Sequence, residues 1–362
     1  MRDDRLVLAI ESSCDETAAA LVRGRTVLAE TVATQAELHE RFGGVVPEIA
    51  SRRHLELLDL VVRDTLAQAD MRLHDVDAVA VTQGPGLVGA LLVGIAGAKA
   101  RAWAAGLPLI PVDHLFGHVA SALLAPGEPI EPPYLCLLVS GGHTLVLDVD
   151  ESMRITLLGT TRDDAAGEAF DKGARLLGLD MPGGPALSRR ASTADPEAAA
   201  AVAFTPAMVH HDTLDTSFSG IKTALSVALR SRARTDAGEP GAGPDDATLA
   251  AAYEDAIVAT VAASARKLLR ARGPASGHRD SRGTLAVVGG VAANAKLRLQ
   301  MADICNEFDV RSVATPLQWC GDNAAMIGVA SNWCSERSGH TAWSVDAYAT
   351  TPLFRDGILV PN

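Results

Sequence analysis

The sequence predicts an α/β protein made of two similar halves. Short apolar stretches typical of strands alternate with longer stretches typical of helices, which favours layers of helices packed on sheets. A strand, a polar turn and a second strand occur near the N-terminus, and the same arrangement returns near the middle of the chain. We interpret this repeat as an internal duplication, with one copy in each lobe.

The two copies of the repeat read as β-hairpins. The first runs from Leu6 to Ile10, through the turn ESSCDE, and continues from Thr17 to Val22. Its tip is rich in hydroxyl and carboxyl groups, and the alternation of strand and turn is typical of a hairpin. The second comprises Tyr134 to Val139, the turn SGGH, and Thr144 to Val149.

The length of the chain predicts two lobes, because 362 residues exceed what one hydrophobic core usually serves. The proline-rich stretch PGEPIEPP, from Pro126 to Pro133, is the best boundary between them. We predict an N-terminal lobe over residues 1–130 and a C-terminal lobe over residues 131–335. A tail over residues 336–362 is expected to pack back on the N-terminal lobe.

Composition limits the classes of function. A net charge of −12 argues against extensive unaided binding of nucleic acid, because phosphate contacts need clustered Lys and Arg. Local arginine clusters such as Arg230 to Arg234 are interpreted as solvated helix faces. The five cysteines form no CxxC pair, which is typical of reduced thiols in the cytoplasm. The longest uncharged apolar stretch, Gly84 to Ala98, is too short to span a bilayer. Since no signal peptide is evident either, we expect a cytoplasmic protein without membrane contact.

The histidines of the segment VDHLFGHVA suggest a metal site. His114 and His118 are four residues apart, so on a helix both imidazoles lie on one face and can bind the same ion. Leu115 stands where the zinc-protease motif HExxH has its glutamate, so protease chemistry is not indicated. The alternative is that both histidines are buried structural residues.

Three glycine-rich turns follow predicted strands, in VTQGPGLVG, LVSGG and VVGGVAAN. Glycine lets backbone N–H groups approach an anion, and a following helix N-terminus adds positive potential. Together these turns suggest a phosphate- or nucleotide-binding cleft between the lobes, although each could be only a tight turn. Neither a P-loop nor a dinucleotide fingerprint is present.

Acidic residues form a third group of candidates. Asp164, Glu168 and Asp171 in DDAAGEAFDK are spaced to share one helical face. Asp322 precedes the apolar stretch NAAMIGVA, where an aspartate would ordinarily cap the start of a helix. Spacing alone leaves open whether Asp322 is a cap or a functional residue.

A series of motifs along the chain resembles the successive motifs of the TsaD family, the bacterial tRNA N6-adenosine threonylcarbamoyltransferases. They are ESSCDETAAALV, HERFGGVVPEIASRRH, TQGPGLVGALLVG, DHLFGHVA, LLVSGGHTLV, DDAAGEAFDK, PGGP, SFSGIKT, GGVAAN and GDNAAMIG. The resemblance implies the duplicated fold of actin, Hsp70 and sugar kinases (the ASKHA fold), with a nucleotide cleft between the lobes. It also implies transfer of threonylcarbamoyl from threonylcarbamoyl-AMP to N6 of adenosine 37, in tRNAs that read codons beginning with adenine.

The resemblance also assigns roles to residues at matching motif positions. The implied metal ligands are His114, His118 and Asp322, holding one ion that is Fe²⁺ or else Zn²⁺. The implied substrate-binding residues are Leu138, Val139, Ser140, Gly141, Gly142, Asp171, Gly184 and Asn294. Asp15 and Glu16 are the implied catalytic residues, close to the reacting group. Because Asp322 is distant in sequence from the histidines, we expect the ion to link the two lobes. Gly321 departs from the usual threonine and is expected to loosen the helix cap at Asp322.

The implied partners are tRNA, threonylcarbamoyl-AMP, the paralogue TsaB and the ATPase TsaE. Two other classes of protein share the expected fold. A small-molecule kinase or ATPase would use Mg²⁺ and gives no role to the histidine pair. A non-catalytic scaffold, like the family's shortened paralogue, would lack the histidines that this chain keeps.

Overall fold

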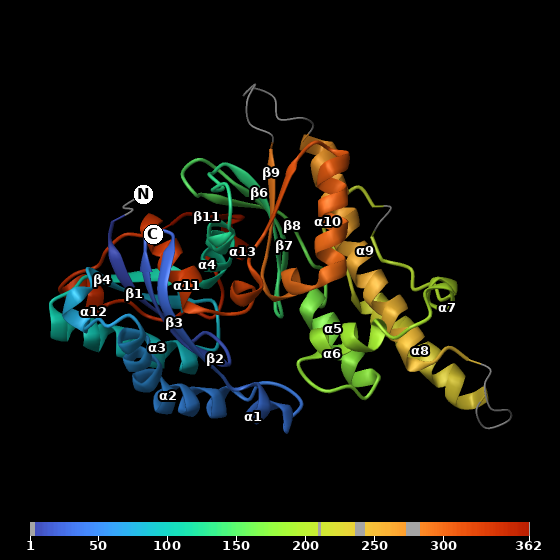
Figure 1. The fold of residues 1–362 in the computed structure, drawn as a ribbon, viewed down its shortest axis with the longest axis horizontal. Helices are drawn as coiled ribbons and strands as arrows, with labels where there is room; N and C mark the ends of the chain where they lie inside the picture. The colour runs from blue at the N-terminus through green and yellow to red at the C-terminus, as the bar shows by residue number, and fades with distance from the viewer. Residues whose placement is uncertain (1–3, 209–210, 236–242, 273–282, 362) are drawn as a thin grey trace. The chain divides into compact units, whose positions relative to one another are not determined.

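The computed structural model describes residues 4–208, 211–235, 243–272 and 283–361 (Figure 1). The strands are β1 (Leu6–Glu11), β2 (Glu16–Arg23), β3 (Thr26–Thr34), β4 (Ala78–Gly84), β5 (Leu109–Asp113), β6 (Tyr134–Val139), β7 (Thr144–Val149), β8 (Ile155–Thr160), β9 (Thr284–Val288), β10 (Arg311–Ala314) and β11 (Ile358–Leu359). The α-helices are α1 (Ala36–Glu40), α2 (Pro47–Gln68), α3 (Val88–Ala105), α4 (His114–Ala120), α5 (Ala166–Leu176), α6 (Gly183–Ala191), α7 (Pro196–Ala201), α8 (Ser219–Thr235), α9 (Asp246–Arg272), α10 (Ala295–Glu307), α11 (Ala324–Ala330), α12 (His340–Trp343) and α13 (Pro352–Asp356).

The chain forms two compact units, which are described separately. Unit 1 consists of Met1–Tyr134, Asp148–Leu157 and Thr315–Asn362, and unit 2 consists of Leu135–Leu147 and Leu158–Ala314. The predicted C-terminal lobe, residues 131–335, therefore ends too late. Residues 315–335 belong to unit 1 because α11 packs against β1, β2 and α4, which are all part of that unit. The predicted tail, 336–362, also falls within unit 1.

The sheet of unit 1 has the strand order β3-β2-β1-β4-β5. β1 pairs antiparallel with β2, from Leu6 opposite Arg23 to Glu11 opposite Ala18, which confirms the first predicted hairpin. β4 runs parallel to β1, and β5 runs parallel to β4. The polar turn between β1 and β2 therefore lies at the same edge of the sheet as the ends of β4 and β5, because parallel strands end at a common edge.

The two faces of this sheet are covered by different helices. Because side chains alternate along a strand, Leu8 and Ile10 share a core with Leu58 of α2 and Ile95 of α3. Figure 1 shows α2 and α3 together along one side of β1 to β4. Ala9 and Val22 point to the opposite face and pack on α11. A Cβ added at Gly328 of α11 would lie 2.5 Å from a Val22 methyl carbon, so the helix lies directly on the sheet.

Helix α3 is the one helix in the described residues with the length and hydropathy of a membrane span. The uncharged apolar stretch Gly84 to Ala98 is too short to span a bilayer, but the helix continues past it to Ala105. Ala90, Leu91, Ile95 and Ala98 on one side of α3 are buried against the sheet and α2. Length and hydropathy alone therefore do not distinguish a membrane-spanning helix from a core helix such as α3.

The second sheet has the order β10-β9-β6-β7-β8-β11. Read from β8 to β10, it repeats the order of the first sheet, with β6 in the place of β1 and β7 in the place of β2. β9 runs parallel to β6, as β4 does to β1. The internal duplication predicted from the two hairpins is therefore confirmed, and the fold is the duplicated α/β fold of the actin, Hsp70 and sugar-kinase type.

Candidate functional site

His114 and His118 lie on α4, at the point where β5 ends. The helix starts here because the Asp113 carboxylate caps it, accepting hydrogen bonds from the N–H groups of Leu115 at 2.8 Å and Phe116 at 3.2 Å. The helix is apolar all round and its residues are buried, so both imidazoles are enclosed by protein. The predicted helical placement of the pair is confirmed.

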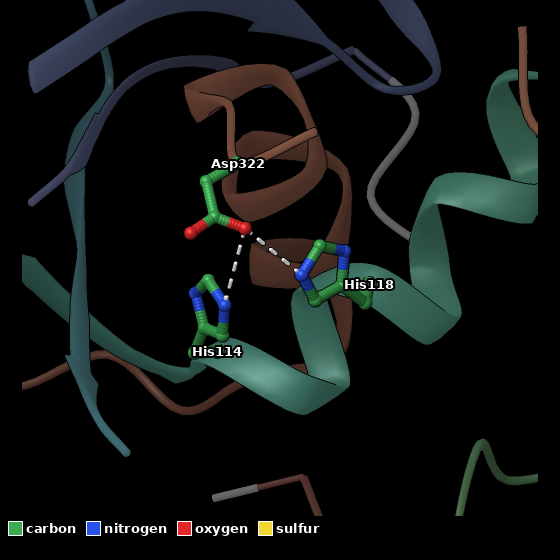
Figure 2. Close-up of side chains that lie close together, drawn as sticks. All are labelled: His114, His118 and Asp322. Atoms are coloured by element: carbon green, nitrogen blue, oxygen red, sulfur yellow. Dashed lines mark hydrogen bonds and ion pairs between the residues drawn. The ribbon is translucent and has the colours of Figure 1, made fainter. Parts of the chain in front are cut away.

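The two imidazoles and Asp322 converge (Figure 2). The Oδ1 atom of Asp322 lies 3.1 Å from Nε2 of His118 and 3.5 Å from Nε2 of His114. One ligand atom from each residue falls within 4.8 Å of the others. Nδ1 of His118 is buried without a hydrogen-bond partner in the described part of the chain. Two imidazoles and one carboxylate are the donor set of many transition-metal sites with open coordination positions, so these residues fit such an ion.

All three candidate ligands belong to unit 1. The expectation that a metal ion would link the two lobes is therefore wrong. The helix after Asp322 explains why. α11 begins at Ala324 and packs on the unit 1 sheet, so Asp322 is held in that unit. Sequence distance was misleading because the chain leaves unit 1, builds most of unit 2 and comes back.

Asp322 is not the cap of α11. Asn323 is the N-cap, and its side chain accepts a hydrogen bond from the N–H of Met326. Glu30 of β3 accepts the N–H groups of Ala324 at 3.0 Å and Ala325 at 2.8 Å, and its other oxygen accepts the indole N–H of Trp319 at 2.9 Å. With the free N–H groups of the helix already bound, the Asp322 carboxylate is left to face the histidines. The expected loosening of a cap at Asp322 by Gly321 is therefore wrong, and the carbonyl of Gly321 accepts the side-chain N–H of the actual cap, Asn323, at 2.8 Å.

A second carboxylate lies behind His114. Nδ1 of this residue is 3.0 Å from Oε2 of Glu11 and 3.2 Å from the hydroxyl of Ser13. Glu11 is fully buried at the end of β1, where it also accepts the hydroxyl of Thr82 at 2.6 Å. Sequence reasoning missed Glu11. The sequence does contain a sign of it, because Glu11 is a charged residue directly after the apolar stretch Leu6 to Ile10.

The charged groups of this cluster, His114, Asp322 and Glu11, shift one another's pKa values. Burial alone would lower the pKa of His114, but the carboxylates of Asp322 and Glu11 raise it well above its ordinary value. Burial likewise opposes ionisation of both carboxylates, yet His114 holds the pKa of Glu11 below its ordinary value and that of Asp322 well below it. Without a metal ion the site is therefore a network in which one imidazolium is shared by two carboxylates.

The predicted catalytic residues Asp15 and Glu16 lie in the β1–β2 turn and the first residue of β2, also in unit 1. Gln35 fixes the turn by donating its N–H to the carbonyl of Asp15 at 2.9 Å. Burial, together with the negative charges of Asp322 and Asp15, raises the pKa of Glu16 to about 9. Glu16 is therefore protonated at neutral pH and can donate a proton or a hydrogen bond.

The glycine turn between β4 and α3 packs against the same β1–β2 turn. The carbonyl of Ser13 accepts the N–H of Leu87 at 2.8 Å, and a Cβ added at Gly86 would lie 2.5 Å from that carbonyl oxygen. Close backbone contact thus explains glycine at position 86. This turn lies in unit 1, whereas the other two glycine turns lie in unit 2, so the three do not form one cluster within a unit.

The predicted substrate residues lie in unit 2. Leu138 and Val139 end β6, and the turn Ser140–Gly142 follows. The carbonyl of Ser140 accepts the N–H of Gly167 at the start of α5, at 3.1 Å. A Cβ added at Gly289, after β9, would lie 2.6 Å from the carbonyl oxygen of Val139. The structure therefore brings two glycine turns and the start of α5 together, while Gly141 and Gly142 have open space beside their Cα atoms.

Asp171 and Asn294 contact α6 in the same unit, and Gly184 is the second residue of that helix. Oδ1 of Asp171 accepts the N–H of Gly183 at 2.9 Å, and Gly184 beside it faces open space. Asn294 caps α10 through its oxygen, and its amide N–H₂ donates to Glu254 at 2.7 Å and Ser188 at 3.2 Å. Sequence reasoning missed the buried Glu254. Asp164 precedes α5, so the predicted shared face with Glu168 and Asp171 is wrong.

The fold and the site define a class: a duplicated actin-like α/β protein with glycine turns after its strands and a His-His-Asp cluster. Its sequence relatives are named as transferases. The profile of the TsaD family, described as tRNA N6-adenosine threonylcarbamoyltransferase, matches residues 26–329. A protein of that name from Anaeromyxobacter dehalogenans is 48% identical, covering 92% of this chain and 96% of the relative. One from Clostridium botulinum is 42% identical, covering 98% and 99%.

The chain belongs to the TsaD family of transferases. Among solved structures, the HypF protein of T. kodakarensis is similar with a TM-score of 0.57 at 13% sequence identity, covering 91% of this chain and 47% of that one. At this identity the likeness concerns the fold alone, and it agrees with the ASKHA-type architecture.

Proposed function

We propose that the protein forms N6-threonylcarbamoyladenosine by transferring threonylcarbamoyl from threonylcarbamoyl-AMP to N6 of adenosine 37 in tRNAs reading codons that begin with adenine. Membership of the family supports the acceptor and the group transferred. The observation that carries the metal-assisted form of the reaction is the convergence of His114 and His118 on one oxygen of Asp322, at 3.5 and 3.1 Å.

In the proposed reaction, N6 of the adenine forms a bond to the carbamoyl carbon while the bond from that carbon to the phosphate oxygen of AMP breaks. The donor is a mixed anhydride with a good leaving group, so no covalent enzyme intermediate is needed. The amine is weakly nucleophilic and must lose a proton, which makes positioning and proton transfer the contribution of the protein. The target base lies in a single-stranded loop, where a protein can reach it without opening a duplex.

His114, His118 and Asp322 would hold one divalent ion, which we propose to be Fe²⁺, with Zn²⁺ as the alternative. Such an ion supplies Lewis acidity that polarises a substrate carbonyl. Glu11 would orient the His114 imidazole from behind through Nδ1. Glu16, with a pKa raised to about 9, would hold a proton near the reacting group, beside the carboxylate of Asp15.

The residues of unit 2 would bind the adenylate. In the turn Ser140–Gly142 the N–H of Ser140 donates to the carbonyl of His143, while Gly141 and Gly142 have open space beside their Cα atoms, which would let a phosphate approach their backbone. The acceptor oxygens of Asp171 suit ribose hydroxyls, and Leu138, Val139, Gly184 and Asn294 complete the proposed set. We further propose that the protein acts in the cytoplasm, together with the paralogue TsaB and the ATPase TsaE.

The transfer assay tests this proposal. Labelled threonine, ATP, a tRNA transcript reading an ANN codon and the partner proteins are combined with the metal-loaded protein. We expect label in the tRNA as threonylcarbamoyladenosine, and none with a transcript that has guanosine at position 37. Absence of label with every divalent metal tried would refute the proposal.

A further inference from the structure

A basic cavity lies between α5 and α8 in unit 2. It has a volume of about 470 Å³, and its lining comprises Lys172, Arg175, Leu176, Lys222, Thr223, Ser226 and Arg230. Every ionisable side chain of the lining is cationic, and the other polar ones are hydroxyls. Neither the metal site nor the proposed adenylate residues contribute to it.

Acidic residues outside the lining hold the two lysines in place. Nζ of Lys172 lies 2.7 Å from Asp164 and 2.8 Å from Glu168, and Nζ of Lys222 lies 3.6 Å from Asp164. Asp164 therefore ties the cationic side chains of the two helices together. The lining itself has four cationic residues and no acidic one, so it concentrates positive charge on a chain whose net charge is −12.

Helix α5 contributes residues both to the cavity and to the proposed adenylate site. Gly167 faces the Ser140–Gly142 turn, and Asp171 reaches the N–H of Gly183. Lys172 and Arg175 of the same helix line the cavity. Because Asp171 and Arg175 are four residues apart on α5, they lie on one face of the helix, and the cavity adjoins the proposed adenylate residues. A base held at the adenylate would therefore bring the phosphates of its neighbouring nucleotides close to this cavity.

We propose that this cavity binds backbone phosphates of the tRNA anticodon loop, next to the adenosine that is modified. The inference rests on the proposed function and adds the surface that holds the substrate. An acidic protein can bind RNA only where cations are concentrated, and guanidinium groups pair with phosphate through two parallel hydrogen bonds. Arg230 is thus assigned a binding role, in place of the solvated helix face expected from sequence.

Two charge changes test the proposal without touching the metal or adenylate residues. Arg230→Glu reverses one lining charge, and Ser226→Glu adds a carboxylate between the cations while removing none of them. The matched control is Arg63→Glu on α2 of unit 1, where the side chain is 71% exposed. Binding of a fluorescein-labelled tRNA transcript to the full chain is measured by anisotropy across a salt series, and thermal unfolding verifies that each variant is folded.

We expect both cavity variants to weaken tRNA binding roughly tenfold at low salt, and Arg230→Glu to reduce the slope of log affinity against log salt by about 1. The Arg63 variant should behave as the wild type. If both cavity variants bind tRNA with the affinity and salt slope of the wild type, the proposal that the cavity binds tRNA is wrong. If the wild-type protein still catalyses transfer in that case, the proposed function stands. Loss of inorganic phosphate binding with unchanged tRNA affinity would mark a small-anion site and would also overturn the proposal that the cavity binds tRNA. A wild-type protein that neither binds tRNA nor modifies it would overturn both.

Discussion

His114 has a carboxylate on each side of its ring. Asp322 lies 3.5 Å from Nε2 and Glu11 lies 3.0 Å from Nδ1. A carboxylate that accepts the far N–H of a ligating imidazole fixes the tautomer and the direction of the ring. From its buried position Glu11 would therefore contribute to the affinity for the proposed ion, although it contacts His114 on the side away from Asp322.

We predict that Glu11→Gln lowers the affinity for the divalent ion by about 10- to 100-fold, because a neutral amide no longer holds His114 in the ligating tautomer. Competition with a chromophoric chelator measures the change. The matched control is Glu48→Gln on α2, which removes a carboxylate that is 76% exposed and takes no part in the site. Equal affinities of wild-type protein and the Glu11 variant would contradict this role.

Asp163 provides a prediction on pH. Its carboxylate accepts the N–H groups of Phe218 and Ser219 and the hydroxyls of Ser217 and Ser219. Partial burial opposes its ionisation, but these hydrogen bonds outweigh burial and hold its pKa below 3.8. A carboxyl group whose pKa is lower in the folded protein than in the unfolded chain stabilises the fold at pH values above the unfolded pKa. This stabilisation is lost as the pH falls through the folded pKa.

Asp163→Asn should therefore lower the free energy of unfolding at pH 7 by about 1 kcal/mol, a value that allows for the exposure of this residue. Below pH 3.8 the difference from wild type should shrink, because Asp163 then becomes protonated in the wild type as well. Denaturant unfolding at both pH values measures this. A difference that is the same at both would contradict the assignment.

Sequence analysis found some residues of the site and missed others for a physical reason. The histidine pair could be predicted because a spacing of four on a helix is local information. Glu11 and Glu30 could not, because they act on partners 103 and 294 residues away. Only the folded sheet brings such partners together. For Asp322, spacing left the choice between helix cap and functional residue open, and only the family resemblance placed it with the histidines; the cap is Asn323.

Among the elements, the C-terminal segment 343–351 holds the start of α4. The hydroxyls of Tyr348 and Thr351 each donate to Oδ2 of Asp113 at 2.7 Å, and Oδ1 of Asp113 caps the helix. Lys99 of α3 donates to the carbonyls of Trp343 and Val345. One buried carboxylate thus connects the segment to the helix that carries both histidines.

We predict that Tyr348→Phe lowers the free energy of unfolding by about 1 kcal/mol, the value of one hydrogen bond. Asp113→Ala should cost about 3 kcal/mol, because it removes a helix cap and leaves two hydroxyls without their acceptor. Ser344→Ala, which removes an exposed hydroxyl of the same segment, should cost nothing measurable. Denaturant unfolding gives all three values. A Tyr348 variant as stable as wild type would show that the segment does not support the helix.

For the whole molecule, the repeated hairpins were sufficient to predict the duplicated fold. The boundaries were not predictable, because the chain crosses between units several times and its return at Thr315 follows a strand rather than a linker. The consequence is a division of tasks: the proposed metal ligands belong to unit 1 and the proposed adenylate residues to unit 2.

Because the two sets of residues lie in different units, we predict that metal binding and adenylate binding can be lost independently. The double variant His114→Ala, His118→Ala should lose bound metal and transfer activity, yet bind an adenylate analogue as wild type does. Asp171→Ala should do the reverse, with full metal content and weakened adenylate binding. Elemental analysis and calorimetric titration measure the two properties. A metal-replete double-histidine variant would return both histidines to a structural role.

The return of the chain to unit 1 also sets the order in which the protein becomes competent during synthesis. His118 and Asp322 are separated by 204 residues, which a ribosome adds in about 10 to 40 s at about 5–20 residues per second. Until then one face of the first sheet lacks α11 and the histidines lack their carboxylate. Loading of the proposed ion would therefore be a late event, since a chain that ends before residue 315 carries both histidines but lacks Asp322.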